Sequence, residues 1–86
     1  MKVNAAAISL QGVNFAIVVV SEDLVNSPGE ADMAIERFQP VFGGVPVLLM
    51  AQNEQGSPIY YGDQDLVRSM ADIPIERMPW KEYSVG

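Results

Sequence analysis

The sequence contains no cysteine and no histidine. Their absence excludes thiol redox chemistry, zinc sites built on these ligands, and catalysis by a Cys–His or Ser–His pair. Positive charge is also scarce, since five Lys and Arg residues stand against eleven Asp and Glu, for a net charge of −6. Because binding to a phosphate backbone needs clustered Lys and Arg, we expect no nucleic-acid partner and no anionic membrane surface.

Long hydrophobic runs are missing as well. The longest apolar stretches, at 15–20 and 45–51, are far shorter than the ~18–20 residues that cross a bilayer. Asn4, Ser9 and Gln11 interrupt the apolar N-terminal region, so no secretory signal is expected. The expected location is cytoplasmic, which agrees with the missing cysteines.

What the sequence does contain is an excess of apolar side chains, because 49% of its residues are hydrophobic. A chain of this length forms a single domain, 1–86, that buries a little over about 60% of its unfolded surface. The apolar surplus over that capacity predicts that some side chains are covered by another chain. A homodimer is the commonest arrangement of that kind.

Turn signals divide the chain into regular segments. Apolar strands at 3–10 and 13–20 are predicted to form a hairpin that turns at Gln11-Gly12. The stretches 15–20 and 45–51 are apolar at every position, which is typical of central strands covered on both faces. A short strand at 59–61 is expected at an edge, and 75–83 is expected to be either an edge strand or an extended tail.

Two helices are predicted between these strands. Ser27 and Glu30 form a capping box, and the helix that follows should end before Pro40, which disfavours helical geometry at Gln39. The inner stripe of this helix comprises Ala31, Ala34, Ile35 and Phe38. Asp63 is expected to cap a second helix, whose inner face comprises Leu66, Val67 and Met70.

The fold class is therefore α/β (α+β), a small two-layer mixed sheet with the order β-β-α-β-β-α and an optional final β. A ferredoxin-like sheet, a thioredoxin-like sheet and another mixed α/β sandwich remain open. A ferredoxin-like sheet would place 59–61 in the centre and 47–50 at an edge, the reverse of what their composition indicates. We therefore favour the thioredoxin-like arrangement.

The segment 45–71 carries a resemblance to that fold. Val45-Pro46, an apolar strand, a hairpin, Gly62 and a helix together resemble the closing β-β-α of the thioredoxin-like fold. The resemblance implies a cis peptide bond before Pro46 and a backbone edge nearby that binds peptides. The paired cysteines of thioredoxins are absent, so no redox function is implied.

Aromatic and methionine side chains close to the expected edges form the main candidate binding surface. They are Tyr60, Tyr61, Met78, Trp80 and Tyr83. Tyrosine, tryptophan and methionine are enriched at protein interfaces, although a lone tryptophan such as Trp80 is equally consistent with a core position. Val45 and Pro46 are added as candidates through the resemblance.

Other motifs have structural interpretations. Asp63-Gln64-Asp65 lacks the further ligands of a calcium loop and is interpreted as a helix cap. Gly43-Gly44 precedes a strand, so it marks a turn and not a phosphate loop. The acidic segment 21–36 is interpreted as a solvated helix face. No carboxylate pair stands in an apolar context that would raise a pKa, so no catalytic residue, metal or cofactor is predicted.

The sequence thus predicts a small, acidic, non-catalytic protein that acts as a homo-oligomeric interaction module, by self-association or by binding another protein. The alternative is a small-ligand or peptide-binding module on a redox-inactive thioredoxin-like scaffold. An enzyme that works through carboxylates is the third hypothesis.

Overall fold

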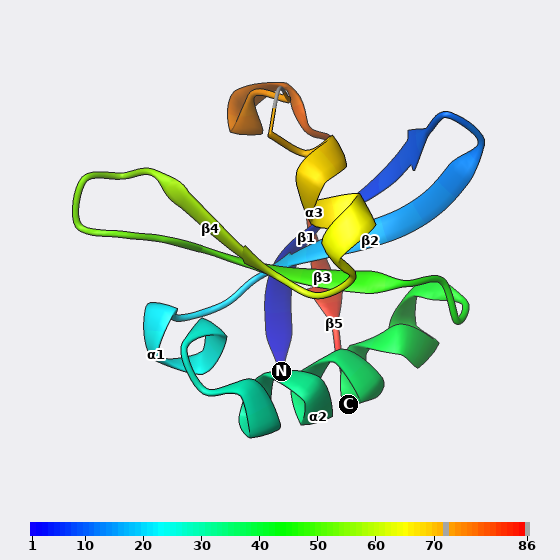
Figure 1. Ribbon diagram of the computed structural model, residues 1–86. Helices are drawn as coiled ribbons and strands as arrows, with labels where there is room; N and C mark the ends of the chain where they lie inside the picture. Colours follow the sequence, from blue (N-terminus) through cyan, green and yellow to red (C-terminus); the bar gives the residue numbers. More distant parts are fainter. Residues whose placement is uncertain (72, 86) are drawn as a thin grey trace.

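A five-stranded mixed sheet organises the chain in the computed structural model, which describes residues 1–71 and 73–85 (Figure 1). The elements are β1 (Lys2–Leu10), β2 (Val13–Val19), α1 (Glu22–Val25), α2 (Pro28–Phe38), the 3-10 turn η1 (Gln39–Phe42), β3 (Val47–Gln52), β4 (Pro58–Tyr61), α3 (Gln64–Ser69), the 3-10 turn η2 (Ile75–Arg77) and β5 (Trp80–Ser84). The strand order is β4-β3-β2-β1-β5. The predicted α+β class and its order of elements are confirmed.

The first two strands form the predicted hairpin. Leu10 pairs directly with Val13, which leaves Gln11 and Gly12 as a two-residue turn. Both turn residues have positive φ, 53° at Gln11 and 80° at Gly12, as the tightest hairpin turns require. Glycine at the second position adopts this conformation without a steric penalty.

The centre of the sheet is a parallel pair. β2 and β3 run in the same direction, with Ala16 opposite Val47 and Val19 opposite Met50, and α1 and α2 connect them. β4 pairs antiparallel with the outer side of β3 and so lies at one edge, while β5 pairs with β1 at the other. The strand at 59–61 is therefore an edge strand as predicted, which excludes the ferredoxin-like order.

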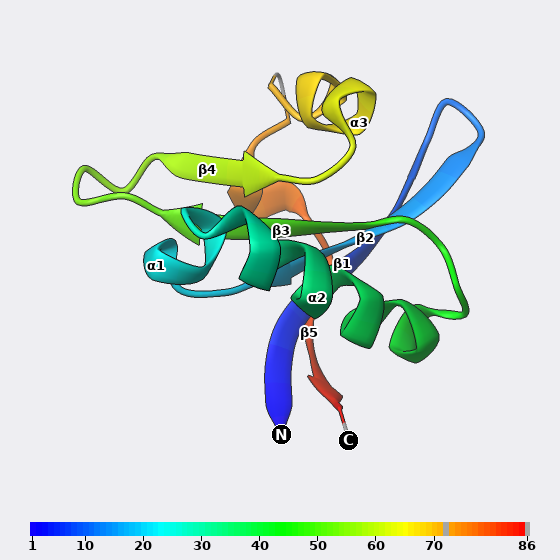
Figure 2. The ribbon, with the colours of Figure 1, turned by 60° about the horizontal axis from the view of Figure 1, so that its bottom comes forward.

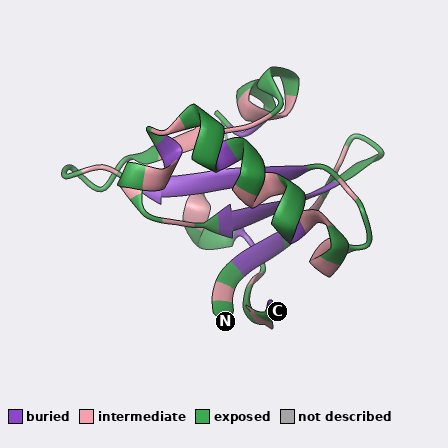
Figure 3. Ribbon diagram, turned by 90° about the horizontal axis from the view of Figure 1, so that it is seen from below, coloured by how far each residue is buried: buried purple, intermediate pink, exposed green. Residues whose placement is uncertain are grey.

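Helical segments pack on both faces of the sheet, α1 and α2 on one and α3 and η2 on the other (Figures 1 and 2). Successive strand residues alternate between the two cores, so that Val18 and Leu49 face α2 while Ile17 and Leu48 face α3. The central strands are buried and the outer surface of α2 is exposed (Figure 3). The fold therefore has three layers, with the sheet between two layers of helical segments, one layer more than the sequence predicts.

Two details predicted for α2 are wrong, namely the capping box and the non-helical geometry of Gln39. The Ser27 hydroxyl makes no cap hydrogen bond to α2 and instead donates to the carbonyl oxygen of Asp23, at 3.0 Å. The unpredicted helix α1 places that carbonyl within reach, and its own cap is Ser21. α2 ends at Phe38, before Pro40, as predicted, but Gln39 keeps helical geometry because the chain continues directly into the 3-10 turn η1.

No helix within the described residues combines the length and the hydropathy needed to cross a membrane.

Candidate functional site

The aromatic candidates do not form one surface. Tyr60 and Tyr61 lie on β4 at one edge of the sheet, whereas Trp80 and Tyr83 lie on β5 at the opposite edge. Within each pair the two side chains also face opposite sides of the sheet, because they lie an odd number of positions apart along the strand. Tyr61 and Tyr83 face the core beneath α2, whereas Tyr60 and Trp80 face the core beneath α3. Met78 is almost fully buried and belongs to the core beneath α3.

Trp80 belongs partly to the core and is partly accessible to solvent. Its indole is half-buried against the core beneath α3, and its Nε1 donates a 2.8 Å hydrogen bond to the carbonyl oxygen of Ile75. The same side chain lines an open groove of about 600 Å³ on the sheet face that α3 leaves uncovered. Val19 and Met50 contribute apolar side chains to this groove, whereas Asn4, Gln52, Lys81 and Glu82 contribute polar or charged ones.

Tyr83 and Val45 line one groove on the sheet face that α1 and α2 cover. The Tyr83 ring packs edge-on against Phe42, with centroids 4.9 Å apart, and both line a shallow groove with Val45. Pro46 differs from what the resemblance implies. The peptide bond before it is trans and not cis. The Pro46 carbonyl oxygen accepts a 2.9 Å hydrogen bond from the Ala16 N–H, so this backbone group is not available to a bound peptide.

Tyr60 and Tyr61 both line a groove of about 320 Å³ beside α2 and α3. The Tyr61 hydroxyl donates to Asp32 Oδ1 at 2.8 Å, and this bond to a carboxylate raises the pKa of Tyr61. The Tyr60 hydroxyl is buried without a hydrogen-bond partner, and burial raises the pKa of this phenol as well. Both phenols therefore stay protonated to a more alkaline pH than an ordinary tyrosine.

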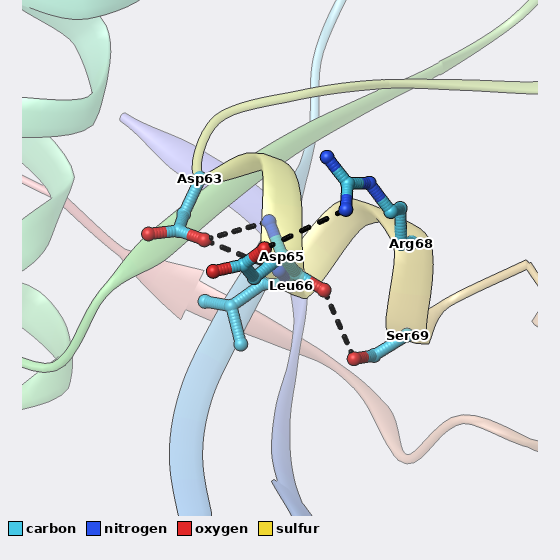
Figure 4. A network of polar contacts seen from close by, with 5 residues as sticks. All are labelled: Asp63, Asp65, Leu66, Arg68 and Ser69. Atoms are coloured by element: carbon cyan, nitrogen blue, oxygen red, sulfur yellow. Dashed lines mark hydrogen bonds and ion pairs between the residues drawn. The ribbon is translucent and has the colours of Figure 1, made fainter.

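The Asp63-Gln64-Asp65 motif is a helix cap, as predicted. Asp63 Oδ1 accepts the backbone N–H groups of Asp65 and Leu66, at 2.9 and 3.2 Å, at the start of α3 (Figure 4). Asp65 lies 3.9 Å from the guanidinium of Arg68, an exposed and long ion pair. These acids therefore stabilise α3, and Leu66, Val67 and Met70 form its inner face as expected.

A further surface, which we call the α2 groove, was not predicted from the sequence. It lies between α2, α1 and the beginning of β1, has a volume of about 410 Å³, and is lined by Met1, Val3, Val20, Leu24, Glu30, Met33, Ala34, Arg37 and Phe38. Met33 is 70% exposed and Met1 is 63% exposed, the two highest values among the large apolar residues of the described chain. The α2 groove is thus an apolar surface open to solvent.

One residue in the sequence indicates the α2 groove. Met33 is a large apolar residue outside the predicted inner stripe of its helix, within the acidic segment 21–36. The rest of the groove depends on β1 and α1, whose positions beside α2 follow only from the packed fold.

The sequence matches no protein-family model and no curated protein, and the fold matches no solved structure.

Proposed function

We propose that this chain is a small, acidic interaction module that acts by self-association, with the α2 groove as its contact surface. The observation that carries the proposal is the exposure of Met33 and Met1 in a groove whose other lining residues are apolar except for Glu30 and Arg37. Clustered apolar side chains of this kind are typical of protein interfaces, and methionine is enriched there. A second copy covers such a surface most simply through a symmetric contact.

Gel filtration with light scattering at two protein concentrations tests the proposal. We expect a mass twice that of the 9.4 kDa chain at the higher concentration, with dissociation on dilution. A monomeric mass at both concentrations would contradict self-association.

A second candidate is a small-ligand or peptide-binding module on a redox-inactive thioredoxin-like scaffold. The groove beside Trp80 favours it, because apolar side chains there stand next to polar and charged ones, which suits a ligand that has an apolar part and also forms hydrogen bonds. β3, β4 and α3 follow one another as the resemblance implies, with β4 at the edge, although the bond before Pro46 is trans. A ligand that binds there should change Trp80 fluorescence and raise the melting temperature.

A further inference from the structure

We propose that α2 packs antiparallel against α2 of a second copy, across a two-fold axis midway between Met33 and Ala34. The inference rests on the proposed self-association and specifies its geometry. Glu30, Met33, Ala34 and Arg37 all line the α2 groove, and their spacings of three, four and seven place them along one side of the helix. This side combines an apolar centre with one charge of each sign at its two ends.

The positions of these residues are self-complementary. In an antiparallel pair centred between Met33 and Ala34, residues equally far from the midpoint lie at the same height. Glu30 of each copy then lies opposite Arg37 of the other, and Met33 lies opposite Ala34. The contact would contain two ion pairs of opposite charge, with a long side chain facing a small one between them.

A register centred on Met33 itself loses the opposite-charge pairs. In that register Glu30 of one copy lies at the height of Glu36 of the other, and Arg37 lies at the height of Gly29. Glu36 is not among the residues that line the α2 groove, so neither charge at the ends of this side finds a partner of opposite sign. The register centred between Met33 and Ala34 pairs both charges.

The net charge of the chain favours the α2 groove as the contact surface. Each copy carries a net charge of −6, so two copies repel one another over most of their surface. Glu30 and Arg37 are the two charged side chains that line the α2 groove, and their charges cancel. Neither residue takes part in an ion pair within the described part of its own chain, so both are free to pair across the axis.

Charge reversal tests this geometry. Arg37→Glu and Glu30→Arg should each weaken the dimer about tenfold, because each single variant turns both ion pairs into like-charge pairs. The double variant Glu30→Arg with Arg37→Glu restores opposite charges and should recover affinity to within about threefold of the original. Met33→Asp should abolish the dimer, because it places a charge in the apolar centre.

Sedimentation velocity over a dilution series measures these affinities. Arg68→Glu, the same charge change on α3, serves as the matched control and should leave the dimer unchanged. All four positions are exposed, so circular dichroism should show native folds. A dimer that survives both Met33→Asp and Arg37→Glu would overturn the α2 geometry while preserving self-association. A wild-type chain that stays monomeric would overturn both proposals.

Discussion

The Tyr61 hydroxyl lies 2.8 Å from Asp32 Oδ1, and this hydrogen bond ties edge strand β4 to helix α2. The same hydroxyl lies 3.3 Å from the carbonyl oxygen of Pro28 at the start of that helix, so its one hydrogen is shared between a near and a more distant acceptor. This phenol therefore connects an edge of the sheet to the layer that covers it.

The raised pKa of Tyr61 predicts a pH dependence of stability. Above pH 10, the ordinary value for tyrosine, the unfolded chain loses this proton before the folded chain does. The contribution to the free energy of unfolding is therefore complete below pH 10 and is lost as the pH rises through the folded pKa. Urea unfolding between pH 8 and pH 11 should show this fall in stability.

Tyr61→Phe is the variant that isolates this effect. It should make the decline above pH 10 shallower without removing it, because burial also raises the pKa of Tyr60. Asp32→Asn should act in the same direction, and Glu36→Gln on the same helix should leave the profile unchanged. If Tyr61→Phe and the original chain gave superimposable profiles, the link between this hydrogen bond and stability would be refuted.

Val18 tests the position of the central strand. Its side chain is fully buried on β2 between two neighbouring strands, so Val18→Lys places an unpaired charge in the core. We expect no soluble, folded protein. Val13→Lys, in the same strand but at a position 44% exposed, should give soluble protein with a native circular dichroism spectrum. A folded Val18→Lys variant would show that the strand is misplaced.

The cap of α3 should contribute a moderate amount to the free energy of unfolding. Asp63→Ala removes the acceptor of two backbone N–H groups and should lower the free energy of unfolding by about 1 kcal/mol. Asp63→Asn keeps an equivalent acceptor and should retain most of that stability. Asp65→Ala should have a smaller effect, because its exposed ion pair with Arg68 contributes little. Equal losses for Asp63→Ala and Asp65→Ala would contradict the assignment of the cap.

Gly62 tests how closely the chain approaches β3. It has a φ of +146°, and an added Cβ would lie 2.5 Å from Leu48 Cδ2, in a side chain that is itself fully buried. Gly62→Ala should therefore destabilise the fold by about 1–3 kcal/mol. Gly29→Ala, in α2 with open space around the new methyl group, should be neutral or stabilise by up to about 1 kcal/mol. Thermal unfolding compares the two, and a harmless Gly62→Ala would rule out this close approach.

The elements that could be predicted are those whose signal is local. β2 and β3 follow from uninterrupted apolar runs, the hairpin from Gln11-Gly12, and α3 from the Asp63 cap. The edge position of β4 follows from Pro58 at its start and Gly62 directly after it. Each of these features depends on neighbours in the sequence, and each is present in the fold.

The remaining features depend on contacts between distant residues. Ser27 matches the capping-box pattern, but its hydroxyl bonds to the Asp23 carbonyl oxygen because a short helix precedes it. The aromatic candidates lie at two opposite edges, because β5 pairs with β1 and not with β4. The α2 groove arises where β1 passes beside a helix some thirty residues later in the chain, which no local pattern encodes.

The pairing of β1 with β5 has a consequence for synthesis on the ribosome. Met1 and Val85, 84 positions apart, exchange hydrogen bonds of 2.7 and 3.0 Å, so the ladder between these strands joins opposite ends of the described chain. While the chain is being translated, β1 can pair with β2 but keeps one side unpaired until β5 has emerged from the exit tunnel. The nascent sheet therefore presents an unprotected edge until β5 is available to cover it.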